Sequence, residues 1–354
     1  MPLLVLSLLT GLVTGSFLGY CIYWLPREGS ILKPVLSYCT CQKSVAWRHR
    51  IPLLSWLCLR GRCRECGQPI SARYPLVEAI TGAFFAAAYW RFGFPLMIPV
   101  WIFGAMLIVT TFIDIEFFLI PDVVSKPAIV AGIASSLFFP ELHATPSRLI
   151  AAGSSIAGAL IGGGLLFIIG ELGKLAFGRY KVILPDPVPF RFENMSADDA
   201  QIVIGTDEFR CSDHFFRKSD RIRIRAEETI VNDQKFQAAE LSLYYDRVET
   251  PAGIIPLTDL DLLQGRTAYA EFPREAMGLG DVKLVTAIGA FTGWAGAIFT
   301  IPAASVIASL FGIAALVIGR REWSSKIPFG PYLAIGAVAW IFCGREIVRL
   351  IFGF

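Results

Sequence analysis

Two aspartates in or beside apolar segments are the residues of this sequence best suited to do chemistry. Asp114 ends one apolar run and Asp281 opens another. Ionisable side chains in such places are costly and are usually functional. Two carboxylates held close together share one proton, so one acts as general base for a water and the other as general acid toward a carbonyl oxygen. The pair therefore predicts peptide hydrolysis of the aspartic-protease type.

The residues before Asp281 also have a structural interpretation. Gly278 and Gly280 let the backbone leave a helix and approach a substrate strand closely. Taken alone, however, Gly-x-Gly is common in membrane proteins, and Asp281 would serve as an ordinary helix cap. A second acid at the matching membrane depth favours the catalytic interpretation.

Other acids near these segments compete for the same roles. Glu116 is the weaker competitor of Asp114 as a catalytic group. Asp122 fits a helix-capping role before the apolar segment that follows it. Glu78 lies near the start of another apolar segment, and we expect it to be structural and paired with Arg73.

Four of the eight cysteines lie in one basic loop, where their spacing fits a metal site. They are Cys39, Cys41, Cys63 and Cys66. Two thiolate pairs at such spacing fold a short loop around one tetrahedral zinc ion, and a loop with little core benefits from such a staple. Free thiols and disulfides are the alternatives, and a reducing cytosol disfavours disulfides. Cys58 is a substitute ligand.

The composition indicates which kind of protein must position these groups. The chain has 354 residues, 55% hydrophobic and only 17% charged, with a mean hydropathy of +0.58. An ordinary globular protein is about 25% charged, so these values exclude a disordered chain and disfavour a soluble enzyme. Residues 179–277 hold 13 Lys/Arg against 18 Asp/Glu, a balance of −5, whereas the remaining residues carry +8. The chain therefore combines an apolar body with a polar insert.

Apolar segments predict about eight membrane-spanning helices. They are Met1–Pro26, Val77–Trp90, Pro95–Ile113, Val123–Phe139, Leu149–Phe177, Val282–Phe291, Ala295–Ile318 and Tyr332–Phe352. The loop 25–75 has nine Lys/Arg and two acids, which predicts that it faces the cytosol. Alternation along the chain then brings Asp114 and Asp281 to the same cytosolic face.

The insert 179–277 reads as a small β-rich cytosolic subdomain. Residues 221–225 alternate Arg and Ile strictly, which is typical of a half-buried strand. Shorter candidate strands are 201–204 and 253–257, and 241–245 fits a strand or a helix. Its −5 balance suggests electrostatic attraction of a basic substrate. In that case, deleting the insert weakens cleavage of such a substrate more at low salt than at high salt.

These motifs, in this order, resemble the type IV prepilin peptidases, which are bifunctional leader peptidases and N-methyltransferases of the membrane GxGD aspartic proteases. The matching segments are Gly15–Leu18, Ile51–Trp56, Arg60–Cys63, Ile70–Glu78, Asp114 with Ile120–Asp122, Gly278–Leu284 and Ile327–Pro331. Three features depart from the family pattern. Gly19 and Trp24 stand where the family often has Asn and Arg. The first cysteine pair is Cys-x-Cys instead of Cys-x-x-Cys, and the acidic insert is foreign to the pattern.

The resemblance implies a polytopic α-helical membrane protein with a zinc loop, to which the strand patterns of this sequence add a β-rich cytosolic insert. Its parts are a first transmembrane helix (1–26), a cytosolic zinc-binding loop (27–75), transmembrane helices two to five (76–178), the insert (179–277) and helices six to eight (278–354). The implied catalytic pair is Asp114 and Asp281, and the implied zinc ligands are Cys39, Cys41, Cys63 and Cys66.

The implied substrates are the N-terminal leaders of type IV prepilins or type II secretion pseudopilins, cut at the cytosolic face of the bacterial inner membrane. The new N-terminus would then be methylated with S-adenosylmethionine. The expected partners are these leaders and the lipid bilayer, with no nucleic acid. Three alternatives remain: a peptidase without methyltransferase activity, a proton-coupled transporter and a non-catalytic zinc-loop scaffold.

Overall fold

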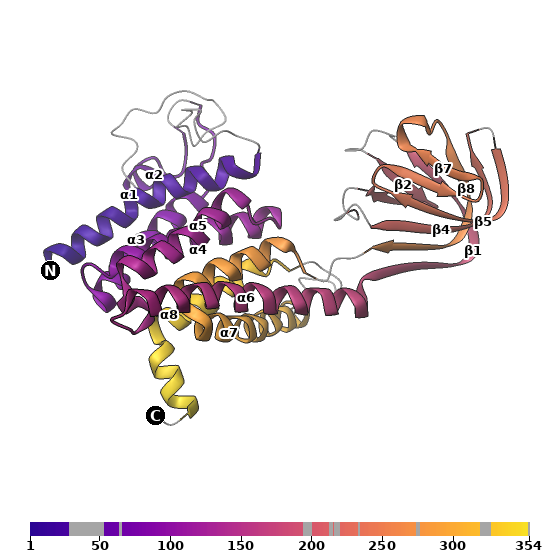
Figure 1. Cartoon of the computed structure of the whole chain (residues 1–354). Helices are drawn as coiled ribbons and strands as arrows, with labels where there is room; N and C mark the ends of the chain where they lie inside the picture. Colours follow the sequence, from indigo (N-terminus) through magenta and orange to yellow (C-terminus); the bar gives the residue numbers. More distant parts are fainter. Residues whose placement is uncertain are drawn as a thin grey trace. The chain divides into compact units, whose positions relative to one another are not determined.

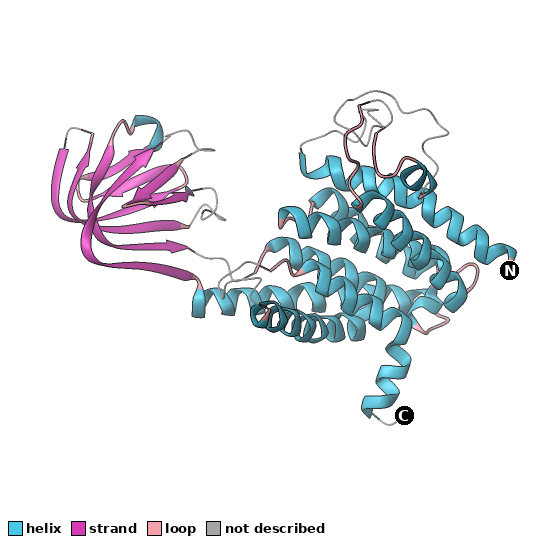
Figure 2. Cartoon of the chain, turned by 180° about the vertical axis from the view of Figure 1, so that it is seen from behind, coloured by secondary structure: helices cyan, strands magenta, loops and turns pink. Residues whose placement is uncertain are grey.

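The structure is a computed structural model that describes residues 1–27, 53–63, 66–193, 200–211, 215, 220–232, 234–273, 277–318 and 327–352. The chain forms two compact units. One comprises Met1–Phe167 and Leu279–Phe354, and the other comprises Ile168–Gly278. Helices make up the first unit and strands make up most of the second (Figure 1; Figure 2).

The helical unit is built from long apolar helices and one short helix in the basic loop. They are α1 (Pro2–Trp24), α2 (Leu54–Cys58), α3 (Arg73–Phe92), α4 (Met97–Phe117), α5 (Asp122–Phe138), α6 (Arg148–Phe177), α7 (Leu279–Val317) and α8 (Gly330–Phe352). Short 3₁₀ helices cover Leu25–Arg27 and Pro140–His143. A buried apolar cluster joins α1, α3 and α4 through Ile22, Val77 and Ile113.

Within the described residues, four helices are long and apolar enough to cross a membrane. They are Pro2–Arg27, Met97–Phe117, Arg148–Ala176 and Leu279–Val317, and Gly330–Gly344 is a shorter apolar segment. Much of the surface of these helices consists of exposed large apolar side chains, as expected of helices that face lipid. The protein is thus a membrane protein with a β-rich insert.

Helix α7 turns back on itself at Gly293. This glycine has φ +72°, a value that interrupts a helix and that side chains disfavour. Atoms of Val285 and Ala297 both lie within 3.2 Å of the place where a Cβ on Gly162 would stand. In a straight helix those two residues would be about 18 Å apart. The two parts of α7 therefore pack side by side against α6.

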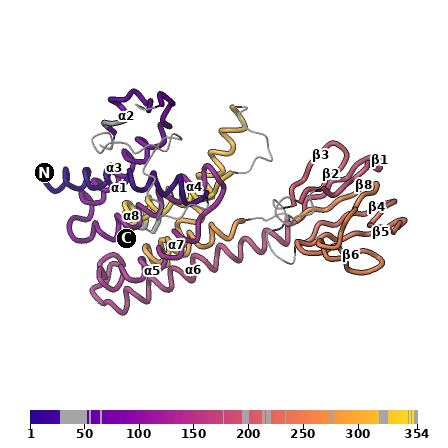
Figure 3. The backbone as a smooth tube through the Cα atoms, turned by 90° about the horizontal axis from the view of Figure 1, so that it is seen from above, coloured from indigo at the N-terminus to yellow at the C-terminus, as the bar shows by residue number. Residues whose placement is uncertain are grey.

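The second unit contains one antiparallel sheet of eight strands in the order β3-β2-β1-β8-β4-β5-β6-β7 (Figure 3). The strands are β1 (Arg179–Glu193), β2 (Gln201–Ile204), β3 (Asp207–Arg210), β4 (Arg221–Val231), β5 (Gln234–Tyr244), β6 (Arg247–Thr250), β7 (Gly253–Pro256) and β8 (Leu263–Pro273), with a 3₁₀ turn at Leu257–Asp259. In β4, Ile222 and Ile224 are buried, whereas the arginines that alternate with them, at positions 221, 223 and 225, are half-buried or exposed. The alternation of Arg and Ile therefore marks a strand with one face on the core.

Candidate active site

Asp114 lies in the last turn of α4, and its carboxylate meets the first residue of α8. Its side chain is buried, with 5% exposed, and Oδ2 accepts a hydrogen bond of 2.8 Å from the backbone N–H of Gly330. The first N–H groups of a helix have no partner within the helix and carry partial positive charge. Asp114 therefore provides an acceptor for a backbone N–H at the start of α8, and this end of α8 in turn stabilises negative charge on Asp114.

Asp281 is the third residue of α7 and lies within electrostatic range of Asp114. The two carboxylates are close enough to interact electrostatically. Asp281 Oδ1 is buried and has no hydrogen-bond partner within the part of the chain that the structure describes. An oxygen of this kind is expensive to leave unsatisfied unless a proton or a substrate meets it. The structure thus brings together the two aspartates that the sequence singles out.

Further contacts hold the two aspartate segments against each other. A Cβ placed on Gly280 would lie 3.0 Å from Cβ of Ile120, so this glycine allows the loop after α4 to pack closely on the start of α7. The Lys283 ammonium pairs with one oxygen of Asp122, and Lys126 pairs with the other at 2.7 Å. These contacts fix the relative position of the two segments.

The capping role expected for Asp122 is wrong. Pro121 occupies the N-cap position of α5, and the cap makes no side-chain hydrogen bond. Asp122 instead is the first residue of the helix and uses its carboxylate for the two lysines. Lys283, near the start of α7, reaches this carboxylate from another helix and forms an ion pair with it.

The competing acid Glu116 is already paired. Its carboxylate forms ion pairs with Arg27, at 3.4 Å, and with Arg73. The pairing expected between Arg73 and Glu78 is therefore wrong. Glu78 is buried, with 8% exposed, and accepts hydrogen bonds from the Ser16 hydroxyl and, at 2.7 Å, from the backbone N–H of Leu53. It links α1 and α3 to the basic loop.

Only half of the predicted zinc site can be described. Cys39 and Cys41 lie outside the described residues. A hydrogen bond closes the chain around the second cysteine pair: Gly67, which follows Cys66 and has φ +70°, donates its N–H to the Cys63 carbonyl at 2.8 Å. This turn fits the second half of a zinc knuckle. The described residues contain no complete group of three metal-binding side chains.

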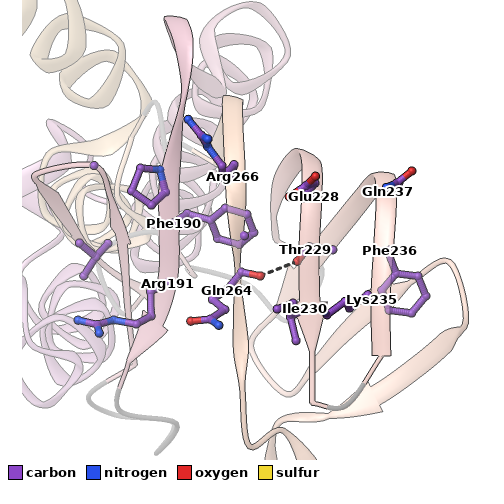
Figure 4. A pocket seen from close by; sticks show the side chains of 14 residues that line it. Phe190, Arg191, Glu228, Thr229, Ile230, Lys235, Phe236, Gln237, Gln264 and Arg266 are labelled. Atoms are coloured by element: carbon purple, nitrogen blue, oxygen red, sulfur yellow. Dashed lines mark hydrogen bonds between the residues drawn. The ribbon is translucent and has the colours of Figure 1, made fainter.

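A cavity on the insert is not a second candidate for peptide hydrolysis. It has a volume of about 710 Å³ and opens on β1, β4, β5 and β8 (Figure 4). Glu228 is its one carboxylate among the described lining residues, beside the cations Arg191, Lys235 and Arg266. Its described lining therefore lacks the pair of carboxylates that hydrolysis of the aspartic-protease type uses.

Reasoning from the sequence did not assign a role to Gly330. The signal was present in Ile327–Pro331, which matched a family motif without an evident function. The structure explains the motif, because a Cβ on Gly330 would lie 2.7 Å from Asp114 Oδ2. A residue with a side chain would displace the Asp114 carboxylate.

Comparison with known families gives two matches along the chain. Residues 9–92 match the family described as Bacterial Peptidase A24 N-terminal domain, and residues 260–313 match the Type IV leader peptidase family. The first segment contains all four cysteines of the predicted zinc site, and the second contains Asp281. Asp114 lies between the two matched segments.

Curated relatives named prepilin leader peptidase/N-methyltransferase are similar to this chain. The one from Myxococcus xanthus is 44% identical over 131 residues, which is 37% of this chain and 38% of the relative. The one from Klebsiella pneumoniae is 42% identical over 36% of this chain and 60% of the relative. The matched regions of these two therefore span less than two thirds of their lengths. The one from Stutzerimonas stutzeri is 25% identical over 96% of this chain and 91% of the relative. No solved structure matches the chain.

Proposed function

We propose that this chain, which belongs to the type IV leader peptidase family, is a membrane aspartic endopeptidase that removes the N-terminal leaders of prepilins or pseudopilins. The meeting of Asp114 and Asp281 carries the proposal, because a carboxylate pair is the machinery that peptide hydrolysis needs. The names of the relatives supply the substrate class. They do not favour a proton-coupled transporter.

The surroundings of the two carboxylates suggest how they divide the work. Asp114 carries the negative charge because it accepts the N–H of Gly330 at the start of α8. Asp281 carries the shared proton because its buried oxygen has no donor among the described residues. Asp114 removes a proton from a water that attacks the scissile carbonyl carbon, and Asp281 protonates the carbonyl oxygen. As the C–N bond breaks, the proton taken by Asp114 passes to the leaving amine. One hydroxyl of the tetrahedral intermediate returns a proton to Asp281, which restores the starting protonation of the pair.

The membrane layout belongs to the same proposal. Eight spans, counting the two parts of α7 separately, place both aspartates on the cytosolic side of the bacterial inner membrane. The basic loop 25–75 supports this orientation. Single cysteines test it when they are introduced into a chain that keeps Cys39, Cys41, Cys63 and Cys66 and has its other cysteines replaced, with that parent chain as the labelling background. We expect a membrane-impermeant maleimide added to intact cells to label position 144, between α5 and α6, but not position 322.

The second half of the proposed function is methylation of the new N-terminus with S-adenosylmethionine as methyl donor. It rests on the N-methyltransferase in the names of the relatives, and we assign no residue to the donor. Mass spectrometry of a processed pilin tests it. One added methyl group on the N-terminal residue supports the proposal, and an unmodified N-terminus identifies a peptidase alone.

The structural zinc site is also part of the proposal. Cys63 and Cys66, at the turn closed by Gly67, would hold one side of the ion. Cys39 and Cys41 would supply the other two sulfurs. The zinc would stabilise the loop, and no step of hydrolysis passes through it.

Cleavage of a prepilin by purified variants tests the peptidase. Asp114→Ala and Asp281→Ala should each abolish cleavage while the protein still inserts and unfolds at its normal temperature. Asp207→Ala is the matched control, because Asp207 is an exposed acid at the sheet edge in β3. Normal cleavage by either catalytic-pair variant would refute the proposal.

A further inference from the structure

Helix α6 passes directly into β1 (Figure 1). A second cavity in the insert unit is lined by residues on both sides of this passage. It has a volume of about 300 Å³ and lies entirely within the unit Ile168–Gly278. Charged side chains dominate its lining: Lys174 at the end of α6, Arg179 in β1, Asp220, Arg221 and Arg223 at the start of β4, and Glu271 in β8.

The charge of this cavity is opposite to that of the insert as a whole. Its described lining has four cations and two acids, a surplus of two positive charges, whereas residues 179–277 carry −5. Both acids are already paired. Lys174 lies 3.2 Å from Asp220, and Arg179 lies 3.0 Å from Glu271. The remaining guanidinium groups therefore give the cavity its positive charge.

Among the described residues, one of these two arginines makes a long contact with the neighbouring strand. Arg221 Nη1 donates to the Tyr244 hydroxyl at 3.4 Å, a long hydrogen bond. Arg221 and Arg223 are two apart on one strand, so their side chains leave the same face of the sheet. A guanidinium group offers five N–H donors in a planar fork that matches phosphate oxygens. The cavity therefore suits an anion with several oxygens.

Exposed apolar side chains surround the same part of the insert unit. Leu172 and Leu175 of α6 are 59% and 85% exposed, and Ile183 of β1 is 71% exposed. Leu172 and Leu175 are the last leucines of the apolar stretch Arg148–Ala176, which is long enough to cross a membrane, and Arg179 follows this stretch directly. Residues that follow such a segment directly lie at the depth of the lipid headgroups. Cations and apolar side chains together are what an anionic lipid requires.

We propose that this cavity binds the phosphate of an anionic phospholipid headgroup, with the acyl chains lying along the exposed apolar residues of α6. Arg221 and Arg223 bind the phosphate, while Lys174 and Arg179 hold Asp220 and Glu271 away from it. The bound lipid ties the base of the sheet to the membrane surface. The acidic remainder of the insert then faces the cytosol, where it does not compete with the lipid for cations.

Lipid binding to the full-length protein, purified in detergent, tests the proposal. Native mass spectrometry should show a preference for phosphatidylglycerol over phosphatidylcholine. Arg221→Gln with Arg223→Gln should weaken phosphatidylglycerol binding about thirtyfold, the effect of about two cationic contacts at a membrane surface. The matched control is Arg191→Gln with Lys235→Gln in the other cavity of the insert (Figure 4), which removes the same charge from the same sheet.

The measurements distinguish a lipid site from attraction by net charge and from a site for a soluble anion. Equal weakening in the two double variants would mean that net charge alone attracts lipid, and it would overturn the proposal. So would equal binding of the two lipids by the wild type. Competition by free glycerol 3-phosphate at matched concentration would identify a soluble phosphate ligand instead. Prepilin cleavage by the same variants is a separate readout, because neither arginine belongs to the aspartate pair.

Discussion

The contact between Gly330 and Asp114 makes the sharpest prediction about the site. Replacing Gly330 with alanine would put Cβ 2.7 Å from Asp114 Oδ2, whereas ordinary contacts begin near 3.4 Å. The carboxylate or the start of α8 must therefore move by about 0.7 Å, and the hydrogen bond to the Gly330 N–H is weakened. Misplacement by about 1 Å costs roughly a hundredfold in rate. A lost hydrogen bond to a charged group costs about 1.5–3 kcal/mol.

We therefore expect Gly330→Ala to lower kcat for leader cleavage about 10- to 100-fold while KM changes little. The assay is cleavage of a purified prepilin in lipid nanodiscs, followed by the shift of the product on a gel. Gly336→Ala is the control, because it makes the same change in the same helix and meets only Thr300 and Ala303, at 3.1 Å or more. The reasoning fails if Gly330→Ala keeps wild-type kcat, or if Gly336→Ala loses as much.

Three further predictions concern stability and metal content. Glu78→Leu should lower the free energy of unfolding by about 1–3 kcal/mol, because it removes the acceptor of the Leu53 N–H and of the Ser16 hydroxyl. Thermal unfolding beside Ser16→Ala, which removes one donor, measures the change, and an unchanged melting temperature contradicts it. Burial lowers the pKa of His143 to about 4. The unfolded state therefore binds a proton that the folded state does not bind, and the free energy of unfolding should fall by up to about 3 kcal/mol as pH falls from about 6.5 to 4. Unfolding titrations of the wild type and of His143→Gln check this, and identical pH profiles of the two proteins oppose it. Cys63→Ser should lower bound zinc from one ion per chain toward none in elemental analysis, with Cys343→Ser unchanged; one zinc ion retained in Cys63→Ser contradicts the ligand assignment.

Local patterns predicted several elements well. The strict alternation in 221–225 marked the start of β4, and the candidate strand 201–204 coincides with β2. The break between the predicted spans 282–291 and 295–318 falls at Gly293, where α7 folds back. These features depend on side-chain periodicity and on one glycine, which are readable over a few residues.

Contacts between distant segments could not be read in the same way. The bond between Asp114 and Gly330 joins residues 216 positions apart, and no local pattern encodes it. The capping role predicted for Asp122 and the pairing predicted between Glu78 and Arg73 are wrong for the same reason. In the sequence, Glu78 has a basic residue nearby and Asp122 stands beside the start of a helix. The packing of the helices instead brings the Leu53 N–H to Glu78 and the Lys283 ammonium to Asp122. The sheet order likewise depends on which strands bury their apolar faces together.

The measurement that tests the central claim most directly is a double-mutant cycle on leader cleavage with Asp114→Asn, Asp281→Asn and the combination. If the two carboxylates act as one unit, each single variant loses nearly all of kcat, and the double variant loses no more than either. Independent losses that multiply in the double variant, or a single variant with wild-type kcat, would contradict catalysis by a shared pair.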